Sequence, residues 1–159
     1  MACDQSDIVI AEGGLDDPDV EALLAHHFAE MRADSPPEAC HVLPSQSLRS
    51  PDIRFFTARG PGGELFGVGA LQALEPGHGE VKSMRTAPAA LGLGVGRAIL
   101  ERLIAEARES GMTKLSLETG NSPLFDAANR LYLNSGFTRC GPFGCYKPTP
   151  FTCFYRCSI

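Results

Sequence analysis

The 159-residue sequence lacks a long apolar run, a basic run and an export signal. No apolar stretch approaches the ~20 residues that a membrane helix needs, and the polar residues 1–7 lack the basic and apolar blocks of a signal peptide. The net charge of −5, without clustered Lys and Arg, argues against a nucleic-acid surface. We therefore expect a cytoplasmic protein with no membrane or nucleic-acid partner.

Paired cysteine motifs and metal-ligand patterns are also missing. None of the six cysteines forms a C-x-x-C pair, and without an export signal they are expected to stay reduced. His26, His27 and His41 do not have metal-ligand spacing. We therefore expect neither a disulfide framework nor a metal.

The apolar residues that are present alternate between a period of two and a period of 3.6 along the chain. The strand-like segments are residues 8–11, 53–59, 64–75, 79–87, 114–119, 137–140 and 151–157. Helix-like segments begin at Asp17-Pro18, at residue 95 and at Ser122-Pro123, with a short helix at residues 45–49. The pattern predicts one α/β (α+β) domain over residues 1–159, with a mixed, mostly antiparallel sheet of about seven strands and about four helices. Residues 79–87 and 114–119 should pair in parallel, because a helix connects them.

The segment Leu91-Gly-Leu-Gly-Val-Gly-Arg97 places three alternating glycines at the start of an amphipathic helix. The first turn of a helix leaves backbone N–H groups without partners, and glycines let phosphate oxygens approach them. A P-loop would need Lys followed by Ser or Thr, and a dinucleotide fold would need G-x-G-x-x-G. The observed G-x-G-x-G spacing fits neither.

This segment resembles motif A of the GNAT acyltransferase superfamily, [QR]-x-x-G-x-[GA], with Gly94 and Gly96 at the two small positions. Leu91 departs from the pattern, which expects Gln or Arg. A second stretch, Leu131-Tyr132-Leu-Asn-Ser-Gly136-Phe137, resembles the end of motif B of the same superfamily. The resemblance covers residues 79–137, and further similarities suggest a bacterial subgroup of small-molecule acetyltransferases.

The resemblance implies an acetyl-CoA-dependent N-acetyltransferase that acts by direct attack of an amine on the thioester. The implied cofactor-binding residues are those of the turn and of the strand before it. They are Met84, Arg85, Thr86, Leu91, Gly92, Leu93, Gly94, Val95, Gly96 and Arg97. The side chain of Arg85 could equally be an ordinary exposed strand arginine.

For the chemistry, the resemblance implies that Tyr132 is a general acid near the cofactor sulfur. Glu80 is the leading candidate for the base, with Glu118 as its rival. Glu80 could instead be a solvated strand residue or a partner of Lys82. His78, in a Pro-Gly-His-Gly turn, is expected to be exposed.

The acceptor amine is expected to bind between the first helix, the proline-rich loop and the strand ends. The candidates for substrate binding are His27, Met31, Arg32 and Glu118, with His26, His41 and Glu38 as further possibilities. His27 could also be a packed histidine of the core. A small-molecule amine is the expected acceptor; a protein or peptide acceptor and a non-catalytic acyl-CoA-binding domain are the alternatives. A homodimer is possible if the strand at residues 151–157 lies at a sheet edge.

Overall fold

The computed structural model describes residues 7–37, 40–41 and 44–159. The elements follow one another as β1 (Val9–Glu12), α1 (Pro18–Asp34), β2 (Ile53–Arg59), β3 (Leu65–Glu75), β4 (His78–Thr86), α2 (Val95–Glu109), β5 (Lys114–Gly120), α3 (Asp126–Asn134), β6 (Thr138–Cys140) and β7 (Thr152–Ser158). Short 3-10 turns lie at Ser45–Arg49, Pro88–Ala90 and Pro123–Phe125. Glu38 lies outside the described residues.

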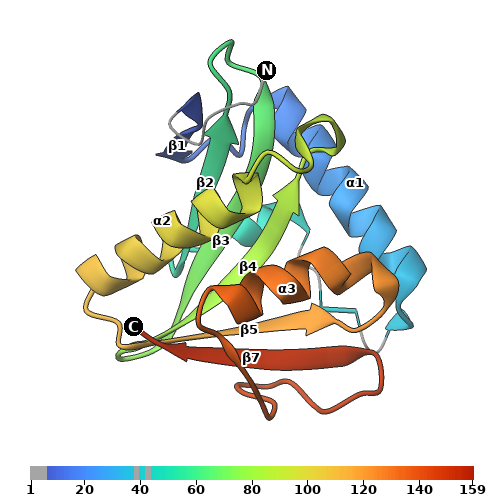
Figure 1. The fold of residues 1–159 in the computed structure, drawn as a ribbon, viewed down its shortest axis with the longest axis vertical. Helices are drawn as coiled ribbons and strands as arrows, with labels where there is room; N and C mark the ends of the chain where they lie inside the picture. The colour runs from blue at the N-terminus through green and yellow to red at the C-terminus, as the bar shows by residue number, and fades with distance from the viewer. Residues whose placement is uncertain (1–6, 38–39, 42–43) are drawn as a thin grey trace.

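The seven described strands form one sheet in the order β1-β2-β3-β4-β5-β7-β6 (Figure 1). The pair β4 and β5 is parallel, and the other neighbours in this sheet are antiparallel. Helix α2 makes the crossover that the parallel pair requires. These observations confirm the predicted mixed, mostly antiparallel α/β fold.

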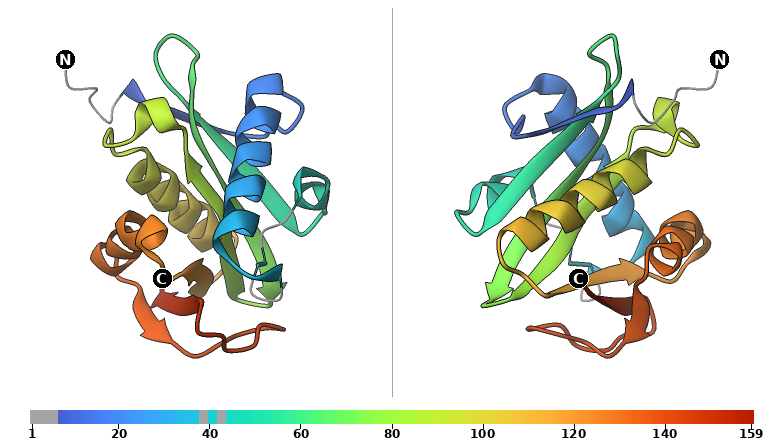
Figure 2. Two further views of the ribbon diagram at one scale, coloured as in Figure 1. Left: turned by 90° about the vertical axis from the view of Figure 1, so that its right-hand side faces the viewer. Right: turned by 60° about the vertical axis from the view of Figure 1, so that its left-hand side comes forward.

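Helices cover both faces of the sheet, with α1 on one face and α2 and α3 on the other (Figures 1 and 2). Strand residues alternate between the two layers because successive side chains point to opposite faces. Phe55 belongs to the cluster beneath α1, together with Leu24, whereas Phe56 belongs to the cluster beneath α2, together with Ile99.

Three expectations need correction. The described residues contain three α-helices rather than about four, because residues 45–49 form a 3-10 turn, in which hydrogen bonds join residues three apart, as from Ser47 N to Pro44 O. Strand β7 is not at an edge, because β5 and β6 pair with its two sides. His78 is buried rather than exposed, because it begins β4 and its Nε2 is hydrogen-bonded to Ser116 Oγ at 2.7 Å.

Among the helices that the structure describes, none has both the length and the apolar character needed to cross a membrane.

Candidate active site

The parallel strands β4 and β5 pair at one end and separate at the other, as Figure 1 shows. Their register covers three positions, ending with Glu80 opposite Ser116. Beyond this point β4 contains an irregularity in its pairing with β3, and Ser83 adopts a φ of 55°. Among the described residues, Ser83 is the one non-glycine residue with a positive φ. Such strained backbone persists only where surrounding structure holds it, often at functional sites.

A cavity of about 140 Å³ lies in the opening between the two strands. Helices α1 and α3, strands β4, β5 and β7, and the loops before β2 and after β6 all contribute to its wall. The lining residues are His27, Met31, Ser35, Cys40, His41, Glu80, Val81, Lys82, Ser83, Met84, Glu118, Thr119, Gly120, Phe125, Ala128, Tyr132, Tyr146 and Thr152. The cavity therefore contains two carboxylates, one lysine, two histidines and two tyrosines.

Glu80 is almost completely buried and binds two donors. Its Oε2 accepts hydrogen bonds from Tyr146 Oη at 2.6 Å and from Lys82 Nζ at 3.1 Å. Lys82 Nζ also donates to Tyr146 Oη at 3.0 Å. The pairing with Lys82 that the sequence left open is therefore present. Residues 80 and 82 share a strand face because their spacing is two.

Glu118, on β5, is the second carboxylate of the cavity wall. Its Oε2 is hydrogen-bonded to His41 Nδ1. Burial raises the pKa of Glu118; His41 opposes this effect and the charge of Glu80 adds to it. The Tyr146 ring packs edge-on against His41, with 4.9 Å between the ring centroids. Because Tyr146 also binds Glu80, it connects the Glu80–Lys82 pair with the Glu118–His41 pair.

Tyr132, on α3, is buried, and its ring contacts Phe137 and Tyr155 with centroids 6.0 Å apart in each case. Burial strongly raises the pKa of Tyr132. Its hydroxyl makes no hydrogen bond to any residue that the structure describes. The phenol thus stays protonated and keeps its donor free beside the cavity.

The residues proposed for substrate binding lie in different places. His27 and Met31 line the cavity, whereas Arg32 is exposed and stacks over Phe28 at 5.4 Å, outside the lining. Burial and, secondarily, the charge of Arg85 lower the pKa of His27 to about 4, and His27 Nδ1 has no partner among the described residues.

Arg85 is committed to a contact within the protein. Its guanidinium donates to both carboxylate oxygens of Glu30, at 2.9 Å each, and so ties β4 to α1. Hydrogen bonding to Arg85 lowers the pKa of Glu30. Arg85 is therefore not an unpaired surface cation.

The glycine-rich turn forms the expected helix start beside the opening. Gly92 and Gly94 have φ near +80°, and Gly94 is the N-cap residue of α2. The first hydrogen bond of the helix runs from Ala98 N to Gly94 O, so the amides of residues 95–97 have no intrahelical partners. A Cβ at Gly96 would lie 3.2 Å from Leu131 of α3. The turn, the end of β4 and the helix that carries Tyr132 are thus neighbours.

Among the turn residues, Leu93 is partly buried and Val95 is fully buried, whereas Leu91 and Arg97 project outward. Arg97 pairs with Glu101 on the same helix at 3.0 Å. Met84 and Thr86 lie on the part of β4 that has separated from β5.

The sequence did not indicate Tyr146, Ser83, Phe125 or Cys40 as members of the site. Tyr146 lies in residues 141–151, a loop without apolar periodicity, so no local pattern predicts its contact with Glu80. The sequence indicated Lys82 only as a possible partner of Glu80. Because residues 80 and 82 are two apart on one strand, their side chains share a face, and this spacing could have predicted that both line the cavity.

The split parallel pair, the cavity in the split and the glycine-rich helix start together define an acyltransferase type of α/β domain. The chain belongs to the GNAT family, since the model of the Acetyltransferase (GNAT) family matches residues 19–137. It is accordingly an N-acetyltransferase of that family.

Similar proteins agree with this assignment. The uncharacterized N-acetyltransferase YedL of Escherichia coli strain K12 is 44% identical over 142 residues, 89% of each chain. The crystal structure of a protein from Klebsiella pneumoniae, described as a candidate acyl-CoA N-acyltransferase, is 30% identical, with a TM-score of 0.76 over 95% of this chain and 97% of that one. A GNAT family acetyltransferase from Elizabethkingia anophelis with acetyl-CoA bound shares the fold, at 17% identity and a TM-score of 0.69 over 97% and 99% of the two chains.

Proposed function

We propose that this enzyme transfers an acetyl group from acetyl-CoA to the amine of a small molecule held in the cavity between β4 and β5. The observation that carries the proposal is the cavity itself. It brings two carboxylates and a free phenol together in the strand opening, next to the glycine-rich start of α2. We further propose that residues 1–159 act as one catalytic domain.

The residues present fit acetyl-CoA. The amides of residues 95–97 have no partners within the helix, so they can donate hydrogen bonds to a pyrophosphate. A Cβ added at Gly92 would meet no atom within 4 Å, so there is room for a phosphate beside this residue. The free edge of β4 at Met84, Arg85 and Thr86 offers backbone groups to the pantetheine arm. An acetyl-CoA-bound neighbour of the same fold supports this choice of donor. Acetyl-CoA supplies the acetyl group as a thioester.

The side chains of the cavity supply the proton chemistry. Because burial raises its pKa, Tyr132 remains a phenol and donates a hydrogen bond to the departing sulfur. An amine is mostly protonated near neutral pH, so a carboxylate of the cavity, Glu80 or Glu118, must accept its proton. Both functions come from side chains, so we propose a reaction without a metal.

A small acceptor is favoured because the cavity is partly covered. His41 and Cys40 from the loop after α1 and Tyr146 from the loop after β6 form part of its wall. A peptide acceptor would need an open groove in their place. Acceptors with a compact group around the amine therefore fit best.

The test is a panel of small amines, amino acids and peptides assayed by release of the CoA thiol. We expect turnover with small amines, and calorimetry should show acetyl-CoA binding without any acceptor. Turnover restricted to peptides would support the protein-modifying alternative. Tight acetyl-CoA binding without turnover on any amine would contradict catalysis.

A further inference from the structure

The two carboxylates of the cavity have different partners, and this difference decides which can take up a proton. Glu80 Oε2 binds an ammonium and a hydroxyl at 3.1 and 2.6 Å. Lys82 is itself largely buried, with 10% of its side chain exposed. If Glu80 accepted a proton, the ion pair would be lost and a buried ammonium would remain unpaired. Breaking a buried pair in this way is strongly destabilising.

Glu118 has a partner that does not require a permanent charge. His41 is hydrogen-bonded to its Oε2 through Nδ1, and an imidazole is stable as a neutral group. Protonation of Glu118 therefore leaves no buried cation behind. Its Oε1 makes no hydrogen bond to a described residue, and Glu118 lines the same cavity as Tyr132.

The groups around Glu118 come from every element that encloses the cavity. They are His41 before β2, Glu80 and Lys82 on β4, Tyr146 after β6, Cys153 on β7, His27 on α1 and Tyr132 on α3. Among them, Glu80 is the one carboxylate, and its negative charge disfavours the ionised form of Glu118.

We propose that the Glu118–His41 pair accepts the proton of the substrate's amine, whereas Glu80 is a positioning residue, a fixed negative charge held in place by Lys82 and Tyr146. The inference rests on the proposed N-acetyl transfer. The amine nitrogen forms its bond to the acetyl carbon while the carbon–sulfur bond breaks. Glu118 takes one proton from the ammonium and releases it to water, and the second proton, which nitrogen loses as the amide forms, also passes to water. The departing thiolate, hydrogen-bonded by Tyr132, takes up one proton from water, so the reaction of an ammonium releases one proton overall.

The first experiment measures kcat/KM against pH for Glu118→Gln, Glu80→Gln and His41→Gln with one acceptor amine. The amine's own titration is common to all variants and cancels in the comparison. Glu118→Gln should lower kcat/KM by about 10²–10⁴-fold. It should also remove from the pH profile the limb, meaning the rise of kcat/KM with pH that reflects ionisation of the enzyme's own base. Glu80→Gln should retain the limb but move its midpoint to lower pH. His41→Gln should move it to higher pH, because its hydrogen bond and charge favour the carboxylate form.

The second experiment does not depend on turnover. NMR titration of protein labelled with ¹³C at the glutamate side-chain carboxyl, assigned by the Glu118→Gln variant, follows the Glu118 carboxyl directly. Its midpoint should fall in Glu80→Gln and rise in His41→Gln. Calorimetry with acetyl-CoA shows whether each variant is folded.

The outcomes separate the two levels of inference. If no amine is acetylated while the NMR midpoints shift in opposite directions, the charge arrangement holds and the proposed function fails. If Glu80→Gln abolishes the pH limb and Glu118→Gln retains it, Glu80 is the base and the present assignment is wrong. Unchanged NMR midpoints in both neighbour variants would also overturn it.

Discussion

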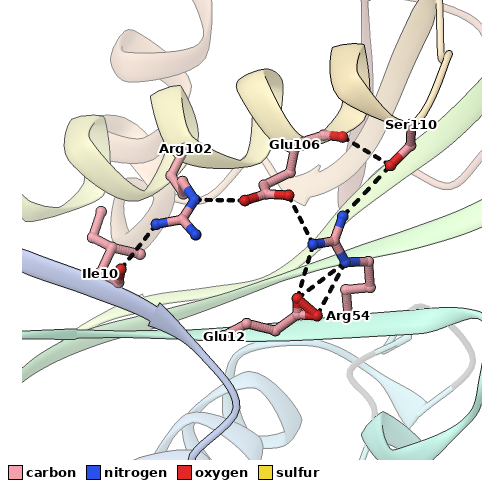
Figure 3. Close-up of polar contacts among 6 residues, drawn as sticks. All are labelled: Ile10, Glu12, Arg54, Arg102, Glu106 and Ser110. Atoms are coloured by element: carbon pink, nitrogen blue, oxygen red, sulfur yellow. Dashed lines mark hydrogen bonds and ion pairs between the residues drawn. The ribbon is translucent and has the colours of Figure 1, made fainter.

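Two charged clusters on this fold are built from similar residues but behave in opposite ways. On the face beneath α2, Arg54 of β2 pairs with Glu12 of β1 and with Glu106 of α2 (Figure 3). Arg102 pairs with the same Glu106 and donates to Ile10 O, at 2.8 and 2.9 Å. Hydrogen bonds lower the pKa of Glu106 and raise that of Arg54, so the charged forms are favoured.

In the cavity, apart from the Glu80–Lys82 ion pair, several groups are driven toward their neutral forms. Burial raises the pKa of Glu118, Tyr132 and Tyr146 and lowers that of His27. The difference lies in the partners, because the side chains of Glu106 and Glu118 are similarly exposed, at 14% and 13%. Glu106 accepts hydrogen bonds from two guanidinium groups, whereas Glu118 is hydrogen-bonded to one imidazole. A carboxylate held by two guanidiniums stays charged and connects β1, β2 and α2, whereas a buried carboxylate without a matched cation is the kind of group that the proposed proton transfer requires.

The strongest test on the cavity side is Tyr132→Phe. The hydroxyl makes no hydrogen bond to a described residue, and the ring keeps its contacts with Phe137 and Tyr155, so the fold should be retained. Loss of the donor to the sulfur should lower kcat by about 10²-fold or more. Steady-state kinetics with an accepted amine measures the change. Acetyl-CoA affinity should stay the same. Full turnover in the variant would mean that water or another residue, not Tyr132, donates to the departing sulfur.

The next largest effect is expected at the glycine turn, for binding rather than rate. Gly94→Val places a branched side chain at φ +80°, beside the unpaired amides of α2. If one or two charge-assisted hydrogen bonds to the pyrophosphate are lost, acetyl-CoA affinity should fall by about 10–100-fold, measured by calorimetry.

Backbone strain is separated from binding by a matched control at the other end of α2. Gly111 has φ +84°, and a built Cβ there meets no atom within 4 Å. Gly111→Val should destabilise the fold through similar strain and leave acetyl-CoA affinity unchanged. Equal affinity in Gly94→Val and wild type would remove the turn from the binding site.

Local patterns in the sequence predicted most of the fold and the glycine turn. The strand at residues 53–59 and the helix start at Pro18 were predicted at their observed positions, because strand parity and helix capping act over a few residues. The cavity depends instead on contacts over long separations. Tyr146 and Glu80 are 66 residues apart, and His41 and Glu118 are 77 apart, and both partners from loops lie in non-periodic segments. No spacing rule connects such residues, so the partners that distinguish the two carboxylates came only from the structure.

The pH dependence of the free energy of unfolding tests whether the cavity keeps His27 neutral. Its pKa of about 4 in the folded protein lies below the usual 6.5, so protons bind the unfolded chain first. This group's stabilising effect is complete above pH 6.5 and is lost as the pH falls toward 4. Linkage gives a loss of about 2 kcal/mol at pH 5. The measurement is urea unfolding at pH 7 and pH 5, compared with His27→Gln, which should lack this component. An identical pH dependence in both proteins would contradict a buried neutral His27.

The smallest effect is expected in the Arg54–Glu106 cluster, where charge is favoured. Because the pKa of Glu106 is lowered from 4.5, its ionised form stabilises the fold above pH 4.5, and this contribution is lost as the pH falls through the lowered pKa. Glu106→Gln should therefore reduce the free energy of unfolding by about 1 kcal/mol at pH 7, and the gap should narrow as the pH falls below 4.5 and through the lowered pKa. Glu101→Gln is the matched control, because Glu101 pairs with Arg97 at the same i,i+4 spacing on α2 but with both side chains exposed. Its loss should be about 0.3 kcal/mol. Losses of equal size in the two variants would mean that the shared carboxylate adds nothing beyond an ordinary helix pair, and the contrast between the two clusters would then rest on the cavity alone.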